Sequence, residues 1–395
     1  MRKPRILVAQ QGCIPIYRES FFQRLNMRGA INYVVVHGPA PRGTDLILAN
    51  PPFDFPNLPV KNYEIRIAGR SCIWQPIVWR AIKGEFDGAV FGDEVKFVSS
   101  VIATVALRLR GRPVLFWGFG FHQYFNRQEA LLARVTATLA AQYKKILYRL
   151  ISGYLVYTKG GEQALRDLAT APKRIVVLRN TIDTEREAKF RAAVAVEPLD
   201  MAFRSLGVRP ERLKLLYFGR FLPEKCVDLL VEYAKRCMQV GRKVDVIIFG
   251  QGVEEARLRE LAQNLSNVAF HRHDNLLLAR ALRISAAIVI PGFVGLAVTH
   301  GFIHGVPILT RHGQAHSPEV EYLEHSVNGL MLPEAPEEFF AALDAFVDNP
   351  DLQRRLAEGA ERSGRMINMD DMVAAFDGLV QSVLRLSARP SKQES

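Results

Sequence analysis

The sequence predicts an α/β protein that contains two parallel-sheet domains. Apolar, β-branched runs of strand length alternate with helix-length segments along most of the chain, which is typical of βαβ units. The alternation stops at residues 185–212, which are charged, rich in alanine and interrupted by two prolines, and then it starts again. A chain of 395 residues is also too long for one ordinary core. We therefore expect a first domain at residues 1–190, a linker at 191–212 and a second domain at 213–368.

The first half of the chain contains a series of segments with the composition of strands. We expect strands at residues 5–10, 31–37, 63–67, 87–91, 113–117, 154–158 and 174–180. We expect helices at residues 19–27, 97–110, 127–155 and 161–169. Ligands of parallel sheets bind at the carboxyl ends of the strands, and Gly12, Asp93, Glu94 and His122 all follow such ends. These four residues form one candidate set.

The second half repeats the alternation. Strands are expected at residues 213–218, 244–249, 268–271, 286–290 and 307–310, and helices at 227–240, 254–264, 276–282 and 296–304. The chain is helical past Pro336, and we expect residues 369–387 to form a final helix that returns to the first domain. Each half is then Rossmann-like, and the two halves should face each other across a cleft lined by the carboxyl ends of both sets of strands.

The stretch at residues 285–310 is the clearest candidate site. An apolar strand is followed by Pro291-Gly292, a second glycine at Gly295 and a helix that begins near Leu296. A glycine and a proline, in Gly305-Val306-Pro307, then end the helix. This arrangement directs free backbone N–H groups and the positive end of a helix at one point, which suits a phosphate group.

The composition is that of a soluble globular protein with a basic surface. Hydrophobic residues make up 49% of the chain and charged residues 23%, and the formal net charge is +12. No apolar run is long enough to span a bilayer, and the basic N-terminus lacks the cleavage-site pattern of a signal peptide. The four cysteines show no metal or redox spacing, which fits a reducing cytoplasm.

The basic charge, without a nucleic-acid motif, indicates that the partner is a phosphate-bearing substrate or an anionic membrane surface and not nucleic acid.

The expected helix at residues 127–155 carries a run of basic residues among apolar ones. They are Arg127, Arg134, Lys144, Lys145 and Arg149. One interpretation is a solvated face of a core helix; the other is a patch that lies against anionic lipid headgroups. The second interpretation places the protein on the inner face of the membrane as a peripheral protein.

Several motifs occur in a fixed order and together resemble a known family. The second half contains Gly219-Arg220 with Lys225, Phe249-Gly250-Gln251-Gly252, Pro291 to Leu296, Gly305-Val306-Pro307 and Pro318-Glu319. The first half contains Pro15-Ile16-Tyr17-Arg18, Trp117-Gly118, Tyr157-Thr158 and Asn180-Thr181-Ile182-Asp183. This order resembles the retaining glycosyltransferases of family 4, which have the GT-B fold, and in particular their bacterial surface-polysaccharide branch.

The resemblance implies roles for individual residues. In that family an arginine and a lysine after the first strand of the second domain bind the diphosphate of a nucleotide-sugar, and here they are Arg220 and Lys225. Backbone N–H groups near Gly295 and Leu296 would bind the same diphosphate. The other implied donor-side positions are Gly12, Gly219, Gly250, Gly252, Gly292, Val294 and His300, and the acceptor-side positions are Asp93, Glu94 and Trp117. The resemblance implies no metal and no cofactor, with the nucleotide diphosphate sugar as co-substrate.

The sequence departs from the family pattern at one pair of positions. The family has two glutamates eight positions apart, where this chain has Gly292 and His300. An imidazole can still hydrogen-bond a ribose hydroxyl, whereas glycine offers only its backbone. Glu319 could compensate as a catalytic carboxylate, or it could be an ordinary carboxylate at a helix N-terminus. The family's first-domain histidine is replaced by Phe119, and His122 lies three residues further on.

We therefore expect a glycosyltransferase that acts on a saccharide or lipid-linked acceptor in cell-surface polysaccharide biosynthesis. Two alternatives remain: a catalytically weakened binding protein of the same fold, or an inverting transferase with Asp93, Glu94 or His122 as base. His300 and His304 have the spacing of two zinc ligands on one helix face, but no third ligand is placed and the metal interpretation is set aside. Nicotinamide binding is also set aside, since no complete G-x-G-x-x-G motif with an acidic partner follows a strand.

Overall fold

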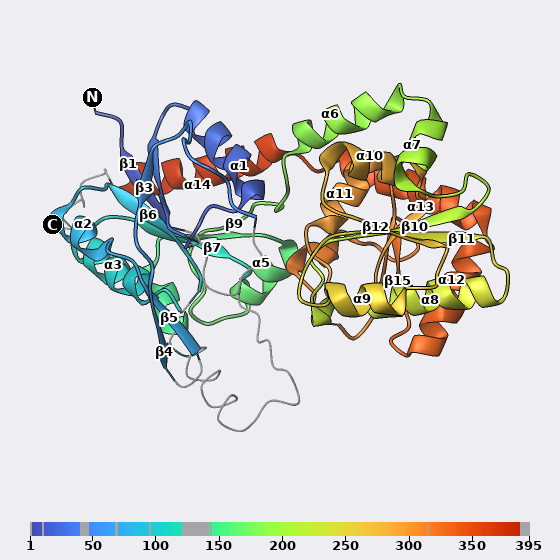
Figure 1. Cartoon of the computed structure of the whole chain (residues 1–395). Helices are drawn as coiled ribbons and strands as arrows, with labels where there is room; N and C mark the ends of the chain where they lie inside the picture. The colour runs from blue at the N-terminus through green and yellow to red at the C-terminus, as the bar shows by residue number, and fades with distance from the viewer. Residues whose placement is uncertain are drawn as a thin grey trace. The chain divides into compact units, whose positions relative to one another are not determined.

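The computed structural model describes residues 2–9, 12–39, 47–67, 70–94, 96–120, 142, 144–314 and 316–387. The chain divides into two compact units (Figure 1). Unit 1 comprises Met1–Asn180 and Asp370–Ser395, and unit 2 comprises Thr181–Met369. The predicted α/β fold with two parallel-sheet domains is confirmed. The boundary between the two lies at residue 180, ten residues before the predicted end of the first domain.

The sheet of unit 1 has seven strands in the order β3-β2-β1-β6-β7-β8-β9, and all neighbouring pairs are parallel. Its strands are β1 (Arg5–Ala9), β2 (Asn32–His37), β3 (Asn57–Pro59), β6 (Gly88–Gly92), β7 (Val114–Gly118), β8 (Gly153–Val156) and β9 (Ile175–Val177). Its helices include α1 (Ile16–Met27), α2 (Val78–Lys83), α3 (Val98–Leu109) and α5 (Lys159–Arg166). The side chains of β6, β7 and β8 are all buried, as expected for strands covered on both faces.

Two predictions for unit 1 need correction. The strand expected at residues 63–67 exists as β4 (Tyr63–Ile67), but it pairs only with β5 (Arg70–Trp74) in a separate antiparallel hairpin. Its alternating pattern predicts a strand but does not reveal the partner. Most of the helix expected at residues 127–155 lies outside the described residues; residues 144–150 are helical, and a strand, β8, already begins at Gly153.

The C-terminal helix α14 (Met369–Ser387) packs on unit 1, as predicted. Its Phe376 ring lies edge-on to Phe21 and Trp117, with ring centroids 5.3 and 5.2 Å away. Asp377 on the same helix is buried and accepts hydrogen bonds from the hydroxyl of Tyr33 at 2.6 Å and from Nε of Arg28 at 3.0 Å. An aromatic cluster and one buried carboxylate therefore fix α14 to unit 1.

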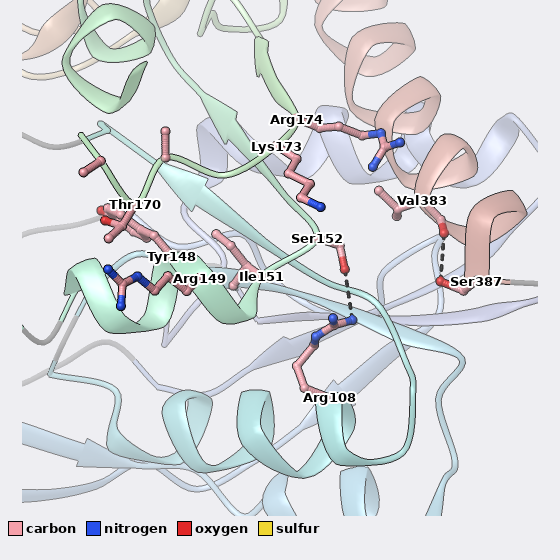
Figure 2. Close-up of a pocket in the computed structure, with 12 residues that line it drawn as sticks. Arg108, Tyr148, Arg149, Ile151, Ser152, Thr170, Lys173, Arg174, Val383 and Ser387 are labelled. Atoms are coloured by element: carbon pink, nitrogen blue, oxygen red, sulfur yellow. Dashed lines mark hydrogen bonds between the residues drawn. The ribbon is translucent and has the colours of Figure 1, made fainter. Parts of the chain in front are cut away.

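A cavity of about 500 Å³ opens in unit 1 at the amino ends of its strands (Figure 2). It lies between the end of α3, the segment before β8, the loop before β9 and the last turn of α14. Gly12, Asp93 and Glu94, candidate residues of unit 1, follow strands at the opposite, carboxyl edge of the same sheet.

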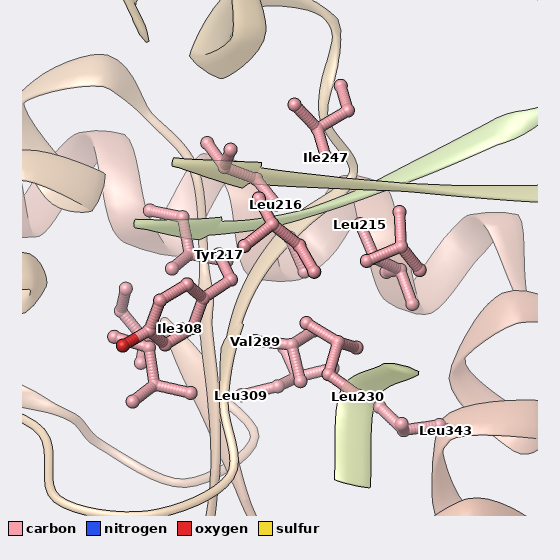
Figure 3. Packing of buried hydrophobic residues seen from close by; sticks show 14 of the residues in the cluster. Leu215, Leu216, Tyr217, Leu230, Ile247, Val289, Ile308, Leu309 and Leu343 are labelled. Atoms are coloured by element: carbon pink, nitrogen blue, oxygen red, sulfur yellow. The ribbon is translucent and has the colours of Figure 1, made fainter. Parts of the chain in front are cut away.

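Unit 2 contains a six-stranded parallel sheet in the order β12-β11-β10-β13-β14-β15. Its strands are β10 (Leu213–Phe218), β11 (Val244–Phe249), β12 (Val268–His271), β13 (Ala287–Ile290), β14 (Ile308–Arg311) and β15 (Gly329–Leu332). Its other helices are α8 (Val227–Gln239), α9 (Glu255–Leu261), α10 (Asn275–Ile284), α11 (Ala297–His304), α12 (Pro336–Val347) and α13 (Pro350–Arg365). Figure 3 shows its core, in which Leu215 and Leu216 of β10 pack with apolar side chains of the neighbouring strands and helices.

The predicted linker is wrong. Residues 184–206 form two helices of unit 2, α6 (Thr184–Ala195) and α7 (Leu199–Leu206), which pack against α10 and α11. Buried Val194, Ala202 and Leu206 supply the apolar contacts, and Glu197 accepts two hydrogen bonds from Arg280, at 2.7 and 2.8 Å. The high content of charged residues hides these helices in the sequence, because only a few positions face the core.

No helix in the described part of the chain is both long enough and apolar enough to cross a membrane.

The docking of α14 gives a prediction for stability. Asp377→Ala leaves the buried hydroxyl of Tyr33 and the guanidinium of Arg28 without their acceptor, and we expect it to destabilise unit 1 by about 2–4 kcal/mol. All three tryptophans, Trp74, Trp79 and Trp117, lie in unit 1, so urea unfolding followed by tryptophan fluorescence measures this change.

Asp370→Ala is the matched control on the same helix. It also removes a carboxylate that pairs with an arginine, Arg24, but the Asp370 side chain is 57% exposed. We expect a loss of about 1 kcal/mol or less from this variant. Equal losses from the two variants would contradict the proposed anchoring by Asp377.

Candidate functional site

The carboxyl edge of the unit 2 sheet brings together the loops that follow β10 and β11. Because these strands are neighbours, the N–H of Gly219 donates to the carbonyl of Phe249 at 3.0 Å, and the N–H of Phe221 donates to the carbonyl of Gln251 at 2.8 Å. A Cβ on Gly250 would lie 2.0 Å from the carbonyl oxygen of Gly219, and one on Gly252 would lie 2.4 Å from that of Phe221. These predicted donor-side glycines thus allow the two loops to pack backbone to backbone.

A second contact joins the loop after β10 to the turn after β13. The N–H groups of Gly292 and Phe293 donate to the carbonyls of Lys225 and Glu224, at 3.0 and 2.7 Å. The ammonium of Lys225 donates in turn to the carbonyl of Phe293 at 2.6 Å and lies 4.7 Å from the centre of its ring. We call this contact, between residues 222–226 and residues 291–293, the clasp.

The clasp explains the glycine at position 292. A Cβ there would lie 2.1 Å from the carbonyl oxygen of Glu224 and 2.7 Å from the carbonyl carbon of Lys225. Backbone atoms cannot move aside as a flexible side chain can, so the position has no room for any side chain, including the glutamate of the family pattern. The N–H of Gly292 is also already used within the clasp, and the residue is therefore a packing residue in this structure.

Two cations stand at this edge in different environments. Arg220 is exposed, and its guanidinium forms no hydrogen bond or ion pair with any described residue; its carbonyl accepts from the hydroxyl of Tyr217 at 2.8 Å. Lys225 is partly buried, and this burial, together with the nearby charge of Arg220, lowers the pKa of its ammonium to about 8. The two positive charges repel each other, and a bound anion or surrounding water offsets this repulsion.

The N-terminal end of α11 presents backbone donors beside the clasp. The N–H groups of Gly295 and Leu296 have no hydrogen-bond acceptor within the described residues. The N–H of Val294, in contrast, donates to Nδ1 of His316 at 3.2 Å, while Nε2 of His316 lies 3.0 Å from the carbonyl of Arg311. Burial lowers the pKa of His316, which fits a neutral ring that accepts at Nδ1. Val294 is fully buried, so of these predicted donor-binding residues only Gly295 and Leu296 offer free groups.

His300 belongs to a cluster that the sequence did not reveal. Its Nδ1 lies 3.4 Å from Oε2 of Glu187 on α6, and Nε2 of His304 lies 3.4 Å from the same oxygen. Burial alone would raise the pKa of the Glu187 carboxyl, but the two imidazoles outweigh this effect and hold the pKa well below its usual range. The ring of His300 is also packed edge-on against Phe218, with centroids 5.4 Å apart. Glu187 and Phe218 therefore fix the ring, whose Nε2 has no partner among the described residues.

The two histidines of α11 have different roles within the described residues. The described residues contain no group of three or more histidine, cysteine or acidic side chains placed to hold a metal ion. His304 is buried with its Nε2 on Glu187, so it serves the packing of α11 on α6.

Glu319 is not presented to a ligand. It lies in the 3₁₀ turn η2 (Pro318–Tyr322), its residue is 1% exposed, and the hydroxyl of Ser317 donates to its Oε2. The carboxylate of Glu319 is therefore not open to a ligand and does not replace the missing glutamates. The structure favours the alternative, a carboxylate that stabilises a local turn.

In unit 1 the predicted acceptor-side residues serve the fold. Asp93 accepts hydrogen bonds from the hydroxyls of Tyr148 and Tyr154, at 2.8 and 2.6 Å, and from the ammonium of Lys144 at 3.0 Å. Burial and the negative charge of Asp93 raise the pKa of both tyrosines. With three donors on one buried carboxylate, Asp93 is poorly suited to act as a base. Glu94 is partly exposed and pairs with Lys96.

Trp117, a predicted acceptor-side residue of unit 1, packs against a buried arginine. Trp117 is completely buried, and the guanidinium of Arg18 lies 4.9 Å from its ring centre. Arg18 is 1% exposed and donates to the hydroxyl of Tyr157 at 3.2 Å. Trp117 is therefore a core residue that packs beneath the carboxyl edge of the sheet. Gly12 is also buried, with its carbonyl accepting from the amide of Asn62 at 3.0 Å, and His122 lies outside the described residues.

The clasp generates one prediction. Gly292→Ala forces a methyl group into backbone atoms, and we expect it to destabilise unit 2 by about 1–3 kcal/mol, measured by urea unfolding with circular dichroism. The control is Gly295→Ala, because a Cβ at Gly295 has its nearest neighbours at 3.8 and 3.9 Å, which is ordinary contact. This variant should change stability by about 0.5 kcal/mol or less. If both variants are equally stable, the clasp does not constrain position 292.

The Glu187 cluster generates a second prediction, on pH. Because the folded-state pKa of Glu187 is lowered, its carboxylate adds stability that is fully present above the usual glutamate pKa of about 4.3 and is lost as the pH falls below it. Glu187→Gln should therefore cost about 1–3 kcal/mol at pH 7, and the difference from wild type should shrink in acid. Urea unfolding at a series of pH values measures it.

Glu211→Gln is the control for this series, since Glu211 is exposed. We expect it to change stability by about 0.5 kcal/mol or less at every pH. A Glu187→Gln effect that is constant from neutral pH into acid would show that the carboxylate charge does not stabilise the cluster.

Comparisons with known proteins agree with this geometry. Residues 200–363, which lie within unit 2, match the family model of glycosyl transferases group 1. Comparison of the sequence with curated proteins gives no match.

Three solved structures with low sequence identity share the fold over nearly the whole chain. Sucrose-phosphate synthase from Thermosynechococcus elongatus is 16% identical with a TM-score of 0.67, covering 98% of this chain and 100% of its own. WaaG, a glycosyltransferase involved in lipopolysaccharide biosynthesis, is 14% identical with a TM-score of 0.63, covering 95% and 99%. A TarM mutant from S. aureus, in complex with fondaparinux, α-GlcNAc-glycerol and UDP, is 9% identical with a TM-score of 0.60, covering 95% and 99%. Residues 200–363 thus match the model of a glycosyl transferases group 1 domain, and the chain as a whole has the fold of GT-B glycosyltransferases.

Proposed function

We propose that this protein is a retaining glycosyltransferase that moves a sugar from a nucleoside diphosphate sugar to a saccharide or lipid-linked acceptor in cell-surface polysaccharide biosynthesis. One observation carries the proposal. Adjoining loops at the carboxyl edge of a group 1 domain carry three kinds of group that can bind an anion. They are the guanidinium of Arg220, which is unpaired within the described residues, the ammonium of Lys225 and the free N–H groups at the start of α11.

These groups suit the leaving diphosphate of such a donor. As the bond between the anomeric carbon and the diphosphate oxygen breaks, negative charge builds up on the diphosphate, and fixed cations and N–H donors stabilise it. Arg220 can bind two phosphate oxygens with its planar guanidinium. Lys225, whose pKa is lowered to about 8, remains mainly protonated at neutral pH and becomes more firmly so beside a bound anion.

Retention is supported by the two carboxylates that the structure describes on the acceptor side. An inverting transferase needs a carboxylate or imidazole that is free to take the acceptor's proton. Asp93 is held by three donors and Glu94 pairs with Lys96. In a retaining transfer the acceptor oxygen bonds to the same face of the anomeric carbon, and its proton passes to an oxygen of the departing phosphate. No protein base is then required.

His300 takes the ribose side of the donor in this proposal. The interaction of Nδ1 with Glu187 fixes the ring and leaves Nε2 for a hydroxyl group of the nucleotide. Gly292 contributes no side chain to the site, because the clasp fills its space. The donor site is therefore built without the usual pair of glutamates.

The acceptor and the membrane are proposed from the net charge and from a neighbour in fold. The net charge of +12 favours anionic surroundings, and WaaG, a neighbour in fold, acts in lipopolysaccharide biosynthesis. Of the basic residues in segment 127–155, Lys144 already pairs with Asp93, and Arg127 and Arg134 lie outside the described residues. We propose peripheral binding to an anionic membrane on its cytoplasmic side, with no nucleic acid partner, no metal and no cofactor.

The experiment that tests the donor site is calorimetric titration of a panel of nucleoside diphosphates and their sugar conjugates. We expect one nucleotide to bind, and Arg220→Ala to weaken its binding by about 10- to 100-fold through loss of a charge-assisted phosphate contact. Arg204→Ala is the control, since Arg204 is 80% exposed on α7. Its affinity should match that of the wild type.

Either of two outcomes would count against the proposal. If no nucleotide binds, the alternative of a binding protein that has lost its donor takes its place. If a nucleotide binds equally well to the Arg220→Ala and Arg204→Ala variants, the diphosphate does not lie at Arg220.

A further inference from the structure

The cavity at the amino ends of β7, β8 and β9 has no role in the proposed transfer. It lies at the edge of the unit 1 sheet opposite to Asp93, between Arg108 at the end of α3, Ser152 before β8 and the loop that contains Lys173 (Figure 2). Its volume of about 500 Å³ falls within the range of about 300–1,000 Å³ that is typical of small-molecule sites. All residues that line the cavity belong to unit 1, whereas the donor site belongs to unit 2.

The charge of the cavity wall is entirely positive. Four cationic side chains line the cavity, Arg108, Arg149, Lys173 and Arg174, and no aspartate or glutamate lies among the lining residues. None of the four forms an ion pair with a carboxylate within the described part of the chain. Two other basic residues of unit 1, Arg112 and Arg166, do form ion pairs, with Asp87 and Glu162 respectively.

The hydrogen bonds of the cavity wall leave donors available. Arg108 donates to the hydroxyl of Ser152 at 3.3 Å and to the carbonyl of Arg112 at 3.4 Å, both of which are neutral acceptors. Because the Ser152 oxygen accepts this bond, its own proton remains free to be donated. Figure 2 shows Lys173 and Arg108 pointing toward the same part of the cavity as Ser152. Cations that converge in a concave site without a counterion favour a bound anion, most of all a multiply charged one.

We propose that this cavity binds a phosphate group, carried either by a free phosphate compound or by an anionic lipid headgroup. Arg108, Lys173 and the hydroxyl of Ser152 contact the phosphate oxygens, and Arg149 and Arg174 contribute charge at the rim. Because the site lies at the amino edge of the sheet, a ligand here does not compete with substrates at the carboxyl edge. It acts as an effector or as an anchor to a phospholipid surface.

The test uses the full-length protein and a charge-matched pair of variants. Arg149→Gln/Lys173→Gln removes two exposed cations of the cavity, neither of which forms a side-chain hydrogen bond or an ion pair within the described residues. Lys61→Gln/Lys83→Gln removes two exposed cations of the same unit away from the cavity. Each is titrated with inorganic phosphate and pyrophosphate by calorimetry, and each is sedimented with phosphatidylglycerol and with phosphatidylcholine vesicles. Arg220→Ala is included to identify binding at the unit 2 site.

We expect the cavity variant to weaken phosphate binding about tenfold or more and the surface variant to leave it within about twofold, while Arg220→Ala removes only the binding that belongs to the unit 2 site and leaves the binding in the cavity in place. Selective loss of phosphatidylglycerol binding in the cavity variant, without soluble phosphate binding by the wild type, would assign the ligand as a lipid headgroup. The proposal is overturned if the wild type binds neither ligand, if the two charge-matched variants lose binding equally, or if only Arg220→Ala loses it. Failure of nucleotide binding at Arg220 would leave these outcomes unchanged.

Discussion

The clasp is the constraint on which the carboxyl edge of unit 2 depends. Two backbone hydrogen bonds and the Lys225 ammonium hold residues 222–226 against residues 291–293, so the loops after β10 and β13 form one surface. This contact removes the side chain at position 292 and uses the N–H groups of Gly292 and Phe293. It leaves Arg220 and the N–H groups of Gly295 and Leu296 open, and thereby decides which groups a ligand can reach.

The two units use buried charge differently. In unit 1, Asp93 and Asp377 accept hydrogen bonds from tyrosine hydroxyls and basic side chains, and both carboxylates fix packed elements. In unit 2, Glu187 is buried too, but one of its partners, His300, is only partly buried and stands next to the candidate site. A buried carboxylate thus orients a ring that a ligand can reach, which is the usual way in which a binding histidine is held in place.

The fold was largely predictable because its main signal is local. The strands expected at 213–218, 244–249 and 268–271 coincide with β10, β11 and β12, since parallel strands that are buried, as β11 is completely and β10 mostly, or half-buried, as β12 is, read as mainly apolar runs. The linker and the pairing of β4 were wrong, because a charged helix with a narrow apolar face and the choice of a strand's partner depend on contacts distant in the sequence.

The candidate site was likewise predictable only where its signal is local. Arg220 and Gly295 could be proposed from local motifs, whereas Glu187 lies more than a hundred residues from His300, and no pattern connects them. The reason for glycine at 292 is likewise a contact with residues far earlier in the chain.

The path of the chain through the two units has a consequence for synthesis on the ribosome. Unit 2 is continuous, from Thr181 to Met369, whereas unit 1 is completed only when residues 370–387 have been made. Until then the surface formed by Phe21, Tyr33 and Trp117 lacks Phe376, the ring that covers it in the finished protein. Nascent chains therefore expose an aromatic surface throughout the synthesis of unit 2, and exposed apolar surface of this kind makes incomplete domains prone to aggregate. The order of maturation is then reversed relative to the order of the sequence: the second unit can close first, and the first unit closes last.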